Sequence, residues 1–88
     1  MGKPIESLQR GLQVLRALTE GPTWNTLQEL HARTQIPKPT LLAILETLAD
    51  EGIVAKGTHG WALTSAWLMG INAYTLHRLS LTTGQAHP

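Results

Sequence analysis

The side chains that could hold an anionic ligand fall into two short groups. Lys38 and Thr40 stand on either side of Pro39, and an ammonium beside a hydroxyl can contact phosphate oxygens or the edges of nucleic-acid bases. The second group offers similar chemistry on and beside a glycine-bounded turn, and it comprises Lys56, Thr58 and His59. Each group also has an ordinary interpretation: a capping turn with a solvated lysine in the first, and plain turn chemistry in the second.

Catalytic chemistry has little support in the sequence. An enzyme needs a nucleophile, an acid and a base that converge, and the acidic pair Asp50 and Glu51 stands alone near an expected helix end. The histidines are scattered, with no two at the spacing of metal ligands: His31, His59, His77 and His87. The chain has no cysteine and no glycine-rich phosphate loop. We therefore expect no catalysis, no metal and no cofactor.

The composition fits one small globular domain. A chain of 88 residues is too short for a second hydrophobic core. With 42% hydrophobic and 15% charged residues, its composition does not favour disorder. The net charge of +1 argues against a broad basic surface, so any nucleic-acid contact depends on where the few cations lie. The lack of cysteine, of a membrane-length apolar run and of a signal-peptide core predicts a cytoplasmic protein with no membrane partner.

The first expected helix covers about 5–20. Ser7 is its expected N-cap, and Gly21-Pro22 ends it. Its apolar residues recur at helical spacing and predict a single face, formed by Leu8, Leu12, Leu15 and Leu18. Trp24, in the loop that follows, is expected to anchor the core.

The second expected helix is short, about two turns. Thr26 can accept a hydrogen bond from the amide of Glu29 while the Glu29 carboxylate reaches back, which is a capping box, and the helix continues to Arg33. The start of this helix, with Thr26 and Gln28, could receive a phosphate. Arg33 could contact a phosphate or complement the helix dipole.

A tight turn with two prolines then leads into a third helix over about 38–51, which Gly52 ends. Its expected buried face comprises Leu41, Ile44, Leu45 and Leu48. Leu42 and Ala43 lie off that face, where an exposed leucine could contact a thymine methyl group or simply be apolar surface. Glu46 on the same side would repel phosphate.

After Gly52 the pattern changes to two short strands, over 53–56 and 61–63, joined by a turn over 57–60. We expect this hairpin to pack on the helices through Ile53, Trp61 and Leu63. Thr64 or Ser65 can cap a last helix that reaches about Ser80, so the domain covers 1–80 and 81–88 is a flexible tail. The apolar residues of this helix cover more than one face and predict a dimer interface formed by Trp67, Ile71, Tyr74, Leu76 and Leu79. The alternative is that these residues pack on the domain's own core or against a further domain.

The expected fold is mainly α with a small β-hairpin. A three-helix core, a two-stranded hairpin and an extra C-terminal helix, in this order, make a winged helix-turn-helix. In that arrangement the first helix of the pair braces against the DNA backbone, the second enters the major groove, and the hairpin reaches adjacent backbone.

Several stretches resemble the DNA-binding domain of IclR-type transcription regulators. They are Ser7-Leu8-Gln9-Arg10, Leu27-Gln28-Glu29-Leu30, Ile36-Pro37-Lys38-Pro39-Thr40, Leu45-Glu46-Thr47-Leu48, Glu51-Gly52-Ile53-Val54, and Trp61-Ala62-Leu63 before Leu68 and Gly70. The resemblance covers roughly 5–75. It implies a dimeric DNA-binding module that is usually joined to an effector-binding domain, so the chain is expected to be either a fragment or a free-standing relative.

The chain departs from that family pattern at three positions. Pro39 stands where the family usually has serine, Ala43 where an arginine is usual, and Gln35 where glycine is common in the turn. An arginine supplies the commonest two-pronged base contact, so Ala43 weakens the expected DNA contact.

Two hypotheses of function remain open at this point. The first is a sequence-specific regulator that binds double-stranded DNA as a homodimer. The alternative is a winged-helix module that binds and modulates another regulatory protein and has lost most of its DNA contacts.

Overall fold

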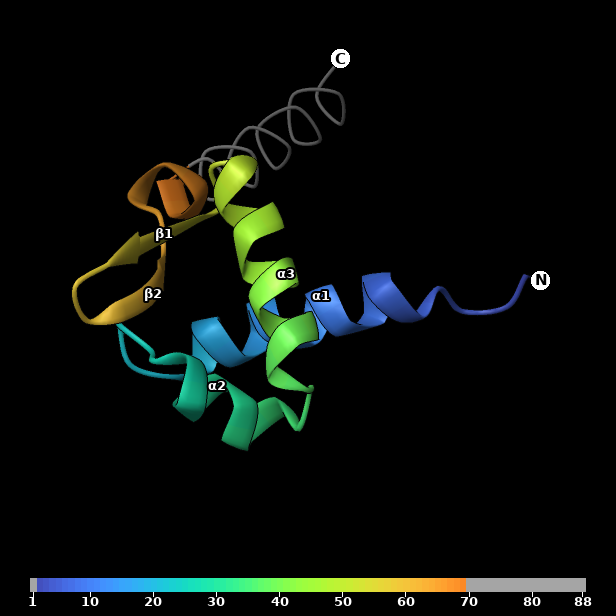
Figure 1. Cartoon of the computed structure of the whole chain (residues 1–88). Helices are drawn as coiled ribbons and strands as arrows, with labels where there is room; N and C mark the ends of the chain where they lie inside the picture. Colours follow the sequence, from blue (N-terminus) through green and yellow to red (C-terminus); the bar gives the residue numbers. More distant parts are fainter. Residues whose placement is uncertain (1, 70–88) are drawn as a thin grey trace, which may run out of the picture.

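The computed structural model describes residues 2–69, which form three helices, a hairpin and the beginning of a further helix over 65–69 (Figure 1). The elements are α1 (Glu6–Glu20), α2 (Leu27–Thr34), α3 (Lys38–Asp50), β1 (Val54–Gly57) and β2 (Gly60–Leu63). The prediction of a mainly helical domain with a small hairpin is therefore confirmed. None of the helices in the described part of the chain has the length and apolar character needed to cross a bilayer.

The core lies where the three helices and the hairpin meet. Its fully buried aliphatic side chains come from all three helices and are Val14, Leu30, Leu41 and Leu45. Val54 and Trp61 close the cluster from the hairpin, and Ile53 and Leu63 pack against it half-buried. The expected contact of the hairpin with the helices is thus present, with Val54 as an additional member.

The expected leucine face of α1 is wrong in its N-terminal half. Leu8 is 58% exposed and Leu12 51% exposed, whereas the residues of α1 that enter the core are Val14, Ala17 and Leu18. The reason is that α1 extends past α3 towards its N-terminus, so only its C-terminal half is covered (Figure 1). Ser7 is also not the N-cap, because α1 begins at Glu6, after Ile5, and no side chain caps it.

The α2–α3 connection is tight, as expected. The capping box of Thr26 and Glu29 starts α2, and Gln35 ends it in the left-handed region with φ 62°. Ile36 fills the core between the helices, and the ring nitrogen Nδ1 of His31 donates to its carbonyl oxygen at 2.7 Å, which fixes the tautomer. The expected stripe of α3 is largely confirmed, but Leu42 is half-buried and packs against the core instead of lying off it.

The hairpin is antiparallel, with Val54 opposite Leu63 and Lys56 opposite Trp61. A further backbone bridge joins Trp61 to Asn25, in the loop before α2. Trp24 is 40% exposed, so the expectation that it anchors the core is wrong. Its ring instead lies against the backbone of Gly57, because the loop carries it onto the outer surface of the hairpin.

The last helix begins where it was expected. The Thr64 hydroxyl accepts from the Trp67 amide at 3.1 Å, and 65–69 are helical. Trp67 is half-buried. The continuation to Ser80 and the tail over 81–88 lie outside the described residues, as do the remaining residues of the expected dimer interface: Ile71, Tyr74, Leu76 and Leu79.

Candidate nucleic-acid interface

The start of α3 presents the first group of candidate side chains. Lys38 is the first helical residue, and Lys38 and Pro39 are exposed while Thr40 is half-buried. The amide N–H groups at a helix start favour an anion, and the lysine adds a full positive charge there. Pro39 has no N–H, which removes one of the donors from this turn.

The middle of α3 has a different outer surface. Ala43, Glu46 and Thr47 are exposed, and the Thr47 hydroxyl donates to the Ala43 carbonyl at 2.8 Å, so it is used within the helix. Sequence reasoning did not select Thr47, although it stands four residues after Ala43 and seven after Thr40, which is one helical face. Past Lys38 the exposed surface of this helix thus offers small groups and the carboxylates of Glu46 and Asp50.

The hairpin, the wing of this fold, carries the second group of candidates. Lys56, Thr58 and His59 are all exposed. The Lys56 ammonium lies 5.4 Å from the centre of the Trp61 ring on the opposite strand, a cation–π contact that restrains the charge at the wing surface. Figure 1 shows the wing beside α3 on one flank and the N-terminal half of α1 on the other, so α3 lies between them.

The start of α2 is already occupied by its own capping box. Thr26 N–H donates to Glu29 Oε1 at 2.8 Å, and Glu29 N–H donates to Thr26 Oγ1 at 3.1 Å. The Thr26 backbone N–H, and after it the Thr26 hydroxyl, hold the pKa of Glu29 below its ordinary value. An ionised carboxylate therefore stands at the helix start that could have received a phosphate, while Gln28 beside it is exposed.

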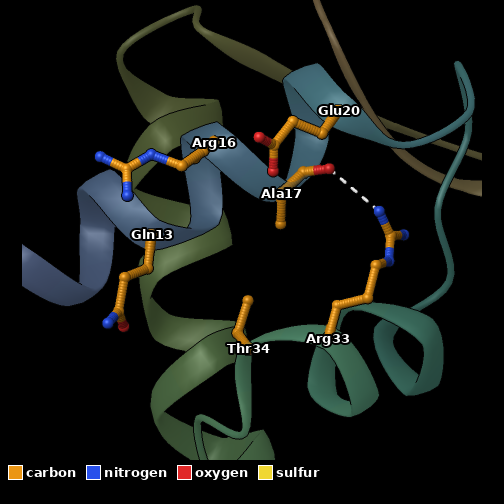
Figure 2. Close-up of a pocket in the computed structure, with 6 residues that line it drawn as sticks. All are labelled: Gln13, Arg16, Ala17, Glu20, Arg33 and Thr34. Carbon is orange, nitrogen blue, oxygen red and sulfur yellow. Dashed lines mark hydrogen bonds between the residues drawn. The ribbon is translucent and has the colours of Figure 1, made fainter.

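Arg33 has two partners inside the protein. Its Nη1 donates to the Ala17 carbonyl at 3.0 Å, and its Nη2 donates to Asn25 Oδ1. Figure 2 shows the guanidinium reaching from α2 to the end of α1, across a polar groove of about 320 Å³ whose rim also carries Arg16 and Glu20. The arginine thus links two helices, which the sequence pattern did not indicate.

A second, apolar groove of about 680 Å³ lies between the N-terminal half of α1 and the outer flank of α3. Its lining comprises Glu6, Ser7, Leu8, Arg10, Gly11, Thr40, Ala43, Ile44, Thr47 and Leu48. Arg10 is tied to Glu6 by an ion pair of 2.8 Å, so the charges on this rim neutralise each other. The groove is a consequence of the uncovered half of α1 and was not expected from the sequence.

Three helices with a tight turn between the second and third, followed at once by an antiparallel hairpin, define a winged helix-turn-helix domain. The family model of the IclR helix-turn-helix domain matches residues 7–57, which is more than half of the chain. The chain therefore belongs to the IclR helix-turn-helix family, the DNA-binding modules of transcription regulators. No match is found among curated proteins.

Proposed function

We propose that the chain is a sequence-specific regulator of transcription that binds double-stranded DNA in the cytoplasm and acts as a homodimer. The observation that carries the proposal is the family match, which extends from α1 through β1 and so includes both helices of the DNA-binding unit. In this proposal α3 enters the major groove, and the wing lies along adjacent backbone.

The proposed DNA contacts come from the first half of α3 and from the wing. On α3 they are Lys38, Pro39, Thr40 and Ala43, and on the wing they are Lys56, Thr58 and His59. Gln28 adds a contact at the start of α2. Three earlier candidates have weaker roles: Leu42 is half-buried, and Thr26 and Arg33 are hydrogen-bonded within the protein.

The homodimer is supported by an apolar stripe on the uncovered half of α1. Ile5, Leu8 and Leu12 are all exposed, and with the half-buried Leu15 they recur at spacings of three, four and three residues. That is the repeat of a helix seam that packs on a second helix. Trp67 and the expected apolar face of the last helix would share the interface, and two copies related by a two-fold axis would present two α3 helices.

Selection from a random duplex pool at moderate salt tests this function. We expect enrichment of a near-palindromic site with half-sites about 10 base pairs apart, because one small module has too few contacts for useful affinity. Lys38→Ala and Lys56→Ala should each weaken binding to all sequences and lower the salt slope by about one, with a stability change of no more than about 0.5 kcal/mol.

Two results would contradict the proposal. One is a selection that enriches no motif while the protein is folded and active in other respects. The other is normal DNA affinity in both lysine variants, which would mean that the DNA-facing surface has been assigned to the wrong side. Arg16→Ala, which removes one positive charge from the α1–α2 groove as the lysine variants do from the proposed DNA surface, is the matched control.

The second candidate function is binding of another regulatory protein. The observation that favours it is the outer surface of α3, where Ala43, Glu46 and Thr47 supply no cation and no two-pronged hydrogen-bond donor. A chain that enriches no duplex but binds one defined regulator with a fixed stoichiometry would fit this alternative. A chain that enriches a palindrome would exclude it as the main role.

A further inference from the structure

The wing is joined to the helices by a buried polar residue that was not selected from the sequence. Asn25 is 0% exposed and lies in the loop between α1 and α2. Its N–H donates to the Trp61 carbonyl at 2.9 Å, and the Trp61 N–H donates to the Asn25 carbonyl at 2.7 Å. This antiparallel bridge attaches one residue of the loop to the free edge of β2.

The side chain of Asn25 continues the link into the helices. Its Nδ2 donates to the Pro22 carbonyl at 2.9 Å and to the Trp61 carbonyl at 3.4 Å, while its Oδ1 accepts from Arg33. Arg33 in turn donates to the Ala17 carbonyl at 3.0 Å. One hydrogen-bonded pair, Asn25 with Arg33, therefore connects α1, α2 and β2.

Two glycines make room for this pair. Gly60 has φ 113°, and a Cβ built on it would overlap the Asn25 carbonyl. A Cβ on Gly21 would overlap the guanidinium of Arg33. A side chain at Gly60 would push the loop away from β2, so the two backbone segments fit closely there, whereas a side chain at Gly21 would displace the end of the Arg33 side chain.

We propose that Asn25 and Arg33 are positioning residues for the wing, and that they set its place against DNA without contacting DNA themselves. This inference rests on the proposed DNA-binding function. A two-stranded hairpin is marginal alone, so the wing needs outside contacts to hold one orientation. A wing that is held in place before binding also loses less conformational freedom when Lys56, Thr58 and His59 contact the DNA backbone.

The test compares two arginines of the same groove on the site recovered by selection. Arg33→Ala and Arg16→Ala remove the same charge from two exposed side chains, but only Arg33 is held by side-chain hydrogen bonds, to Ala17 and Asn25, whereas the Arg16 side chain has none among the described residues. We expect Arg33→Ala to bind at least about five-fold more weakly than Arg16→Ala, the lower end of coupling between distant sites.

A second change shows whether that loss passes through the wing. In the Arg16→Ala background, Lys56→Ala should lower the salt dependence of DNA affinity by about one unit of slope. In the Arg33→Ala background it should leave that slope unchanged, because the wing no longer reaches the DNA backbone. An equal effect of Lys56→Ala in both backgrounds would overturn the inference, as would equal affinities of the two arginine variants.

Amide exchange on the protein without DNA keeps the inference testable apart from the DNA assay. Arg33→Ala should speed exchange of the Trp61 and Asn25 amides while the Leu45 amide in the core stays protected. If the alanine variant unfolds, Arg33→Lys keeps the charge, loses the two-pronged geometry and should give the same pattern. Unchanged Trp61 exchange overturns the inference, whereas a parent chain that selects no duplex refutes the proposed function itself.

Discussion

The two halves of α1 have opposite surroundings. The C-terminal half puts Val14, Ala17 and Leu18 into the core and offers a carbonyl to Arg33. The N-terminal half extends past α3 and leaves Leu8 and Leu12 in solvent beside the apolar groove. One helix thus serves as a structural support at one end and as an uncovered apolar surface at the other, and the two ends should respond differently to the same substitution.

The largest difference is expected between two leucines of this helix. Leu18→Ala removes a side chain that is 4% exposed and should lower the free energy of unfolding by about 2–5 kcal/mol. Leu12→Ala, at 51% exposed, should lower it by no more than about 0.5 kcal/mol. Urea denaturation at concentrations that keep the chain monomeric measures both. Similar losses would mean that the two halves of α1 are equally covered.

The starts of α1 and α2 give a second comparison. The start of α2 lies near the buried C-terminal end of α1, whereas α1 itself begins at its exposed N-terminal end. Thr26→Ala deletes half of a capping box and should cost about 1 kcal/mol of stability. Ser7→Ala changes an exposed residue in the first turn of α1 and removes no capping hydrogen bond, so it should leave the free energy of unfolding unchanged. If both variants lose the same stability by urea denaturation, the caps do not distinguish the two ends.

Acidification should reveal a smaller change in stability at the start of α2. Because the pKa of Glu29 is lowered in the folded protein, its contribution to stability is present above its ordinary value of 4.5 and disappears as the pH falls through the folded value. Glu29→Gln keeps the cap but cannot titrate, so the variant should lose less stability on acidification.

The measurement is the urea midpoint from neutral pH down to about 3, a range that covers the ordinary carboxyl values. A Glu29→Gln profile that coincides with the parent would contradict the assignment.

Leu12→Glu is expected to change the stability of the monomer little and its assembly most. The residue is exposed, so the monomer should remain folded, but a carboxylate in the apolar stripe would be buried in the proposed dimer without a partner. Sedimentation velocity should show a dimer for the parent and a monomer for the variant. Glu20→Ala, at the other end of α1, should leave the dimer intact.

The order of the elements could be predicted from the sequence because local signals mark each boundary. Gly21-Pro22 ends α1, the capping box starts α2, and Pro37 and Pro39 flank the first residue of α3. These signals act within a few residues, so they can be recognised in the sequence without knowledge of the tertiary contacts. The family resemblance was recognisable for the same reason, since its motifs coincide with these boundaries.

What could not be predicted depends on contacts between distant segments. Leucines recur at helical spacing along the whole of α1, and nothing in the local sequence tells which half of the helix the other helices cover. Asn25 looks like a loop residue, and Arg33 looks like a helix-end cation, until β2 is placed beside the loop. The glycine before Trp61 was the one available hint, since it reads as a turn signal and also permits the close approach of Asn25.

The bridge between Asn25 and Trp61 also determines an order of events when the chain folds. The two residues are 36 positions apart, and the segment between them contains α2, the tight turn and α3. Closing so long a loop carries an entropic cost that short-range helix contacts do not, and this cost falls once the enclosed helices have packed. The wing should therefore dock last, and mutations at this bridge should speed unfolding more than they slow folding.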